Sequence, residues 1–255
     1  MAAKKAKADV KAPEKKNAWL GYSEKVKKDV FKLNEGYKKF ISDCKTEREC
    51  VTETIRMAEA NGYVDLNTVI AENKELKAGD KVYFNNRGKT VAFAVIGKDA
   101  VESGVNITAA HIDSPRLDLK PNPLYEELEL ALFKTHYYGG IKKYQWTNIP
   151  LSIHGTVVKP NGEKVTICIG EKEEDPIFTI SDLLPHLAAE QMERKLKDGV
   201  QGEELNVLVG SIPYEAEDVS ERVKLNILNM LNERYGIKEV DFASSEIELV
   251  PINKL

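Results

Sequence analysis

Apolar side chains recur at helical spacing in two segments near the start of the chain. In residues 22–43 they stand between charged positions, which predicts an amphipathic helix, and Ser23 is suited to cap its first turn. Residues 46–60 predict a second helix of the same kind. Thr46 followed three residues later by Glu49 is typical of a capping box, which places the start of this helix. We expect both helices to be structural.

From residue 81 the period of the apolar positions changes to that of strands. Residues 81–85 and 90–96 predict two strands, and residues 86–89 have the composition of a hairpin turn. Residues 105–111 predict a third strand, apolar enough to lie inside a sheet with both faces covered. Ser114 and Pro115 should end it, because proline donates no hydrogen bond to a neighbouring strand.

Beyond residue 121 short apolar runs are separated by Gly, Pro and Asn. These runs predict strands at 125–133, 149–159, 163–169, 205–210, 237–240 and 246–250. Residues 181–197 predict a helix that begins with a Ser-Asp pair. Residues 219–235 predict another helix, which ends before Gly236. Such a mixture predicts a separate β/α module of about 120 residues, within the usual size of a domain.

The composition excludes several classes of function. With 42% hydrophobic residues, 31% charged residues and a net charge of -4, we expect a globular protein that does not bind nucleic acid. Apolar runs are too short to span a membrane. Three irregularly spaced cysteines favour reduced thiols and a cytoplasmic location. The Lys/Ala-rich residues 1–16 are interpreted as a disordered tail, with a protein-binding arm as the alternative.

His111 and Asp113 are the strongest candidates for chemistry. They follow the predicted strand 105–111, and residues two apart in a strand point to the same side. A neutral imidazole is a common zinc ligand, and an adjacent carboxylate can ligate too or orient the ring. The alternatives are a histidine that caps a strand end and an aspartate that caps a turn.

The segment HIDSPRLDLKP (111–121) resembles the first metal motif of the aspartyl-aminopeptidase family, zinc metallopeptidase family eighteen. The resemblance, closest to its bacterial aminopeptidase-1 members, continues through Asn86–Asp99, Lys134–Trp146, Ile180–Ala188 and Ser244–Pro251. It implies an α/β fold in which an α/β/α zinc-exopeptidase domain is interrupted by an inserted mixed β/α dimerisation domain.

The resemblance also implies domain boundaries. Residues 17–118 correspond to the first part of the catalytic domain, 119–243 to the inserted dimerisation domain and 244–255 to a return that is cut short. The family's remaining metal ligands, among them a bridging Asp and a Glu pair, follow an ELVP-like segment. Here Pro251 is followed by four residues, so we expect a truncated chain.

Roles for individual residues follow from the same resemblance. His111 matches a zinc ligand, and Asp113 matches the catalytic-site residue that orients its ring. The complete family fold holds two zinc ions, and we expect weak or absent zinc binding here. His136 and His186 are candidate substrate-binding residues, with a structural role as the alternative for each. Relatives have a second histidine where this chain has Glu190, which weakens the match of His186.

Two functions are therefore expected from the sequence. The first is a zinc-dependent metallo-aminopeptidase that releases N-terminal residues, acidic ones included, from peptides as a homo-oligomer. Because the chain lacks most metal ligands, we expect it to be inactive alone. The alternative is a non-catalytic fragment that acts as an oligomerisation module.

Overall fold

The computed structural model describes residues 15–216 and 218–254, which fall into two units divided between Ser42 and Asp43. The predicted tail at 1–16 lies almost entirely outside the described residues. In the first unit the 3-10 helix η1 (Ala18–Gly21) precedes α1 (Glu24–Asp43). Ser23 accepts a hydrogen bond from the backbone of Val26 at 3.3 Å, so the predicted helix and its cap are confirmed.

The second unit begins with α2 (Glu47–Glu59), whose capping box is formed as predicted by Thr46 and Glu49. The strands β2 (Lys81–Asn86) and β3 (Thr90–Val95) pair antiparallel and confirm the predicted hairpin. The structure also contains β1 (Val64–Asp65), which pairs parallel with β2, and the short helix α3 (Leu66–Ala71), and neither was expected from the sequence.

The prediction of a strand at 105–111 is wrong. After the short 3-10 helix η2 (Val101–Ser103), residues 104–115 have no regular secondary structure, and the side chain of Ile107 is 82% exposed. An apolar run has the tendency to form a strand, but a strand exists only where another strand accepts and donates its hydrogen bonds. Within the described residues, β3 is the edge of a three-stranded sheet and pairs with β2 alone.

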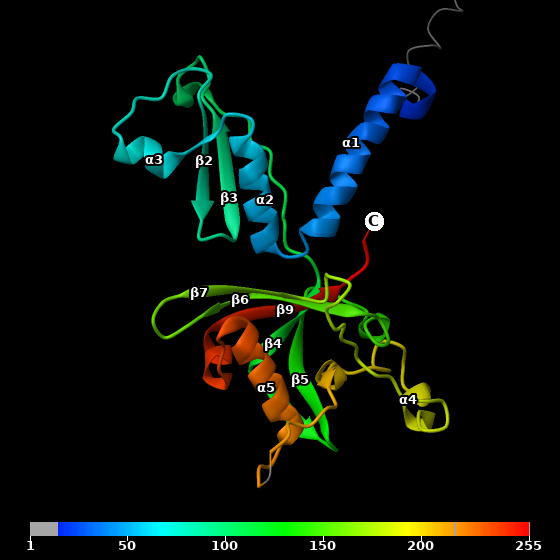
Figure 1. Ribbon diagram of the computed structural model, residues 1–255. Coiled ribbons are helices and arrows are strands. Elements are labelled where there is room, and N and C mark those ends of the chain that lie inside the picture. The colour runs from blue at the N-terminus through cyan, green and yellow to red at the C-terminus, as the bar shows by residue number, and fades with distance from the viewer. Residues whose placement is uncertain (1–14, 217, 255) are drawn as a thin grey trace, which may run out of the picture. The chain divides into compact units, whose positions relative to one another are not determined.

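A six-stranded sheet of order β7-β6-β9-β4-β5-β8 forms the largest part of the second unit (Figure 1). All of its neighbouring strands pair antiparallel. Its strands are β4 (Arg116–Glu127), β5 (Leu130–Tyr138), β6 (Leu151–Val158), β7 (Lys164–Ile169), β8 (Val207–Gly210) and β9 (Ser245–Pro251). The predicted strands at 149–159, 163–169, 205–210 and 246–250 are thereby confirmed.

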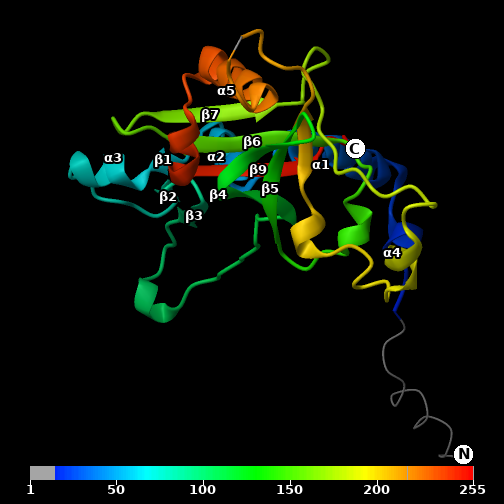
Figure 2. The same cartoon turned by 90° about the horizontal axis from the view of Figure 1, so that it is seen from below.

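One face of this sheet is covered by α5 (Arg222–Tyr235), which lies alongside it in both views (Figure 2). The hydrophobic core of the second unit is built from residues of this sheet and of the segments packed on it. The fully buried side chains of Leu117, Leu151 and Leu249 belong to this core. Leu117 and Leu249 face each other in the β4–β9 pair, so the chain segments just after Asp113 and near its end meet at the centre of the sheet. The helix ends at Gly236 in the left-handed conformation, as its sequence predicts.

Three further predictions are wrong. Residues 125–133 do not form one strand, because Leu128 and Glu129 make the turn between β4 and β5. Residues 237–240 do not form a strand but lead into the 3-10 helix η5 (Glu239–Ser244). The predicted helix at 181–197 is reduced to α4 (Ala189–Glu193), since residues 181–188 form irregular structure and turns around Pro185.

The sheets and helices together agree with the predicted α/β fold class. Among the helices that the structure describes, none combines the length and the apolar character needed to cross a membrane. Cys44 and Cys50 are buried free thiols, and burial raises the pKa of Cys44 to about 12. Both are therefore protonated and unreactive at neutral pH.

Candidate functional site

His111 and Asp113 lie together on the irregular segment that leads into β4. Nδ1 of His111 is 3.2 Å from the backbone carbonyl oxygen of Asp113 and 3.3 Å from its Oδ1. The His111 side chain is 88% exposed, so its remaining ring nitrogen can be reached by a ligand. The two residues come together although the segment is not a strand.

Tyr138, at the end of β5, fixes the position of the Asp113 carboxylate. Its hydroxyl donates a hydrogen bond to Oδ2 of Asp113 at 2.8 Å. This hydrogen bond lowers the pKa of Asp113 and raises that of Tyr138. The Oδ2 atom of Asp113 therefore accepts a hydrogen bond from Tyr138, and its Oδ1 atom lies beside His111.

Arg116 connects this segment to a buried group of carboxylates. Its side chain is 9% exposed, Nη1 donates to Glu47 at 3.0 Å and Nε donates to Asp118 at 2.7 Å. Glu248 lies 3.5 Å from the same Nε. Burial, followed by the charge of Glu47, raises the pKa of Glu248 to about 7. These charges fix α2, β4 and β9 to one another.

A second polar group surrounds His154 on β6. Nδ1 of its ring is 2.6 Å from Glu49, and Nε2 is 3.1 Å from Glu171. Lys45 donates to the same Glu171 at 2.6 Å. Burial lowers the pKa of His154, but the hydrogen bonds and charges of the two glutamates outweigh this effect and raise it. The contacts of His154 with these glutamates are those of a structural residue.

His136 and His186 lie on other segments of the second unit. His136 is exposed on β5 and stacks on Tyr137, and His186 is exposed in the turn before α4. Within the described part of the chain, no hydrogen bond, ion pair or ring contact joins either residue to His111. Their substrate-binding role stays a prediction.

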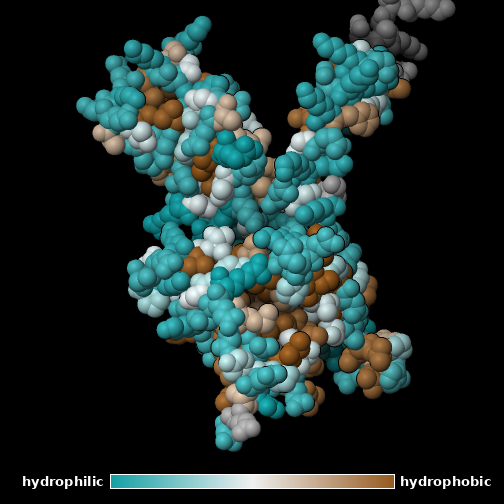
Figure 3. Space-filling view, in the orientation of Figure 1, coloured by the Kyte–Doolittle hydropathy of each residue, from teal (hydrophilic) through white to brown (hydrophobic). Residues whose placement is uncertain are grey.

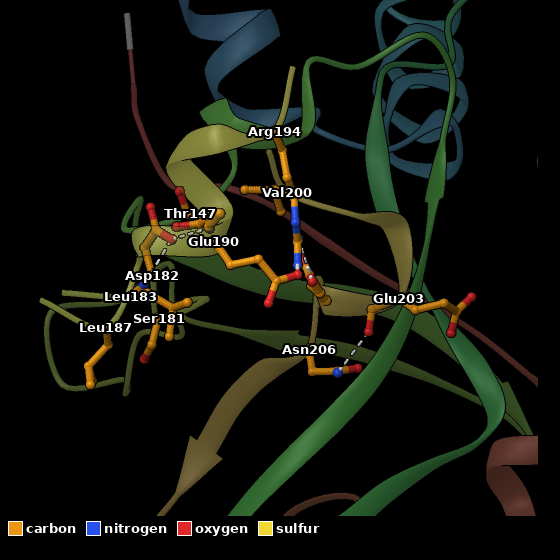
Figure 4. A pocket seen from close by; sticks show the side chains of 12 residues that line it. Thr147, Ser181, Asp182, Leu183, Leu187, Glu190, Arg194, Val200, Glu203 and Asn206 are labelled. Carbon is orange, nitrogen blue, oxygen red and sulfur yellow. Dashed lines mark hydrogen bonds and ion pairs between the residues drawn. The ribbon is translucent and has the colours of Figure 1, made fainter. Parts of the chain in front are cut away.

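A pocket of about 420 Å³ lies beside the segment that carries His186 (Figure 4). Leu183 and Leu187 line it, and Arg194 points into it between two carboxylates. Arg194 donates to Glu190 at 3.3 Å and to Glu204 at 3.1 Å. The charges lining this part of the pocket are therefore already paired.

The side chains present do not complete a zinc site. Zinc takes three or four protein ligands, and His111 with Asp113 offers one imidazole and one carboxylate. Within residues 15–216 and 218–254, no group of three His, Cys, Asp or Glu side chains is arranged to hold a metal ion. His111 can supply one ligand, with Asp113 orienting its ring, and the set is too small for tight binding.

Comparison with known proteins places the chain in one class, the zinc metallopeptidases. The family model described as "Aminopeptidase I zinc metalloprotease (M18)" matches residues 40–255. The chain belongs to this family, as its sequence motifs indicated.

Similar proteins come from several bacteria. The "Probable M18 family aminopeptidase 1" of Clostridium acetobutylicum is 54% identical over 241 residues, which are 94% of this chain and 52% of that protein. The crystal structure of aminopeptidase I from the same organism is 52% identical, with a TM-score of 0.85 over 95% of this chain and 53% of that one. The M18 aminopeptidase structure from Thermotoga maritima is 45% identical, with a TM-score of 0.86 over 95% of this chain and 52% of that one. The chain spans about half the length of the curated relatives it matches.

The sequence did not indicate the residues that surround His111 and Asp113, which together form the H-x-D pair. No role was expected for Arg116, Tyr138 or Glu47. A signal for Tyr138 existed, because the resemblance includes the segment Lys134–Trp146 in which it lies. Glu47 gave no such signal, because its contact with Arg116 joins positions 69 residues apart.

Proposed function

We propose that this chain contributes His111, its orienting carboxylate and the assembly module to a zinc-dependent aminopeptidase that releases N-terminal residues from peptides. The family match over residues 40–255 is the observation that carries this proposal. The contact between His111 and Asp113 supports it, because carboxylate–imidazole pairs orient metal-ligating histidines. The other ligands are proposed to come from the segments that make the relatives about twice as long.

The experiment that tests this proposal adds those segments as a second polypeptide. The purified chain is assayed with aminoacyl chromogenic substrates carrying Asp, Glu or Leu, alone and mixed with a polypeptide covering the second half of the Clostridium acetobutylicum relative. We expect turnover above background in the mixture and none with the chain alone. His111→Ala should abolish turnover of the mixture, whereas His154→Gln at neutral pH should leave a measurable rate. Turnover of the Asp and Glu substrates by the mixture would support the release of acidic residues, and the three rates together measure the preference for the N-terminal residue.

Two outcomes would contradict the proposal. Turnover by the chain alone that survives His111→Ala would show that His111 is not a metal ligand of the active site. Association of the two polypeptides without turnover would favour the second candidate function, a non-catalytic oligomerisation module. The observation that favours this second function is that the described residues hold no group of three metal-ligating side chains.

We further propose that residues 119–243 form the inserted dimerisation module and that the chain is a homo-oligomer. Large apolar side chains gather on the surface around α4, where Figure 3 shows a hydrophobic patch. The residues of this patch that are more than half exposed are Leu183, Leu184, Leu187, Met192 and Leu196. Patches of this kind mark contact surfaces between proteins. Light scattering on the purified chain should therefore give at least a dimer, and a monomer at micromolar concentration would contradict this proposal.

A cytoplasmic location is part of the same proposal. Cys44 and Cys50 are six residues apart, and they and Cys168 are free thiols. Free thiols persist in compartments that glutathione and thioredoxin keep reduced. Quantification of thiols in denaturant should give three free thiols per chain. A count of one, as a disulfide between two of the cysteines would give, would contradict the location.

A further inference from the structure

The contact between Tyr138 and Asp113 is the last step of a continuous series of contacts that begins in the buried carboxylate group. In the β4–β5 pair, Arg116 and Tyr138 stand directly opposite each other. The guanidinium carbon of Arg116 lies 4.0 Å from the centre of the Tyr138 ring, which is the geometry of a cation–π contact. The hydroxyl of that ring reaches Oδ2 of Asp113 at 2.8 Å.

Arg116 is held in place from three elements. Glu47 belongs to α2, Asp118 to β4 and Glu248 to β9, and each presents a carboxylate oxygen within 3.5 Å of the guanidinium. A planar group bound on several edges and 9% exposed has little freedom to rotate. Because Tyr138 stacks on this fixed plane, its ring and hydroxyl have a defined direction as well.

The fixed hydroxyl determines how Asp113 meets His111. With Oδ2 bound to Tyr138, Oδ1 faces Nδ1 of His111 at 3.3 Å, and the Asp113 carbonyl oxygen lies 3.2 Å from the same nitrogen. A carbonyl or ionised carboxylate oxygen can only accept a hydrogen bond, so Nδ1 must carry the proton. The lone pair of the neutral ring is then on Nε2.

We propose that Tyr138 and Arg116 are positioning residues that set the tautomer of His111, so that Nε2 is the nitrogen presented to a metal. The use of Nε2 for a metal rests on the proposed aminopeptidase function. The tautomer itself does not, since it is a property of the chain without metal. The alternative is that Tyr138 only closes the end of the β4–β5 hairpin and has no effect on the imidazole.

Nitrogen-15 NMR of the histidine rings distinguishes the two. The spectra are recorded on the metal-free chain at a pH of about 8.5, where an ordinary imidazole is neutral. The sequence has four histidines, and loss of one set of signals in His111→Ala assigns the residue. In the parent chain we expect His111 to be mainly protonated on Nδ1.

Tyr138→Phe removes only the hydroxyl. We expect the ratio of the Nδ1–H to the Nε2–H form of His111 to fall severalfold, toward the mixture of an unconstrained ring. Tyr137→Phe is the matched control, because Tyr137 is the next residue on β5 and its hydroxyl has no hydrogen bond among the described residues. This control should leave the His111 signals unchanged.

Arg116→Lys tests the first half of the series. Lysine keeps the positive charge but loses the plane on which Tyr138 stacks, so the ratio should fall here too. The signals of the other three histidines report whether each variant is folded. Should Arg116→Lys unfold, the Tyr138→Phe and Tyr137→Phe pair still decides.

The proposal is overturned if His111 in the parent is mainly protonated on Nε2, or if Tyr138→Phe leaves its spectrum like that of the parent. Neither result bears on peptidase activity. Conversely, a shifted ratio in Tyr138→Phe combined with no turnover in the two-polypeptide assay would remove the proposed activity and keep the positioning role.

Discussion

Nδ1 of His154 lies 2.6 Å from Oε1 of Glu49, and this contact joins the centre of β6 to the first turn of α2. The other ring nitrogen faces Glu171, which also binds Lys45. An imidazole between two carboxylates is stabilised in its charged form, so His154 and its partners form a buried ion-pair group. The same Glu49 completes the capping box of α2 with its second carboxylate oxygen.

The first prediction concerns the pH dependence of this group. The raised pKa of His154 means that its contribution to stability is complete below the ordinary histidine value of about 6.5 and is lost as the pH rises through the raised value. The lowered pKa values of Glu49 and Glu171 mean that their contributions are present above the ordinary glutamate value and are lost as the pH falls through the lowered ones.

His154→Gln should therefore lower the free energy of unfolding by about 3 kcal/mol at a pH of about 6, because it leaves buried glutamates without their charged partner. The deficit should shrink as the pH rises toward 9. Denaturant unfolding at several pH values measures it, and His186→Gln is the control at an exposed position. A deficit that does not change with pH would show that His154 is neutral in the folded chain.

The second prediction concerns Glu248, whose Oε2 is buried without a hydrogen-bond partner in the described part of the chain. Its pKa is raised from 4.5 to about 7, so the folded chain binds an extra proton between these values. The stability associated with this proton is complete below 4.5 and is lost as the pH rises through about 7.

Glu248→Gln removes the ionisable group, so the variant does not lose stability as the pH rises through the pKa of Glu248. At a pH of about 8 the variant should be more stable than the parent, by at most roughly 3 kcal/mol for a shift of this size. The difference should disappear toward pH 4.5, the ordinary pKa of a glutamate side chain. Glu246→Gln is the control on the same strand, since its carboxylate already pairs with Arg48 and Lys89 and no gain is expected. The check is thermal unfolding of the parent and both variants at the two pH values. A Glu248→Gln variant that is no more stable than the parent at the higher pH would contradict the prediction.

Local signals in the sequence were sufficient for α1 and α2, which begin with the caps Ser23 and Thr46, and for the β2–β3 hairpin. The Asn86–Lys89 turn contains Arg87 and Gly88 at positive φ, which its composition suggests. The β4–β5 hairpin has the same kind of turn at Leu128 and Glu129, both at positive φ. Because these residue types seldom adopt that conformation, the sequence predicted an uninterrupted strand there.

The candidate site was predictable only in part, for a different physical reason. His111 and Asp113 are two residues apart, so a local pattern finds them. The residues that hold them are distant: Tyr138 is 25 residues from Asp113, and Glu47 is 69 from Arg116. Such contacts depend on strand register and helix packing, which hydrophobic periodicity does not specify.

The third prediction tests the centre of the six-stranded sheet. Gly155 of β6 pairs with Ile247 of β9, and a Cβ on Gly155 would lie 2.8 Å from the Cα of Ile247. Backbone atoms of a central strand cannot move away without breaking neighbouring pairs, so Gly155→Ala should cost about 3 kcal/mol. Gly140→Ala is the control, because a Cβ there meets nothing within 4 Å. Equal stability of the two variants in urea would show that β6 and β9 are not paired in this register.

The last prediction concerns the metal affinity of the H-x-D pair. His111 and Asp113 offer at most two ligands, and Zn²⁺ held by so few exchanges readily with solvent. After loading with zinc and exhaustive dialysis, the purified chain should retain well under about one equivalent by elemental analysis. His111→Ala should remove most of what remains, whereas His136→Ala, at an exposed position that does not contact this pair among the described residues, should not. Two equivalents retained by the parent would mean that other side chains complete the site, and the reading of His111 as a single ligand would then be wrong.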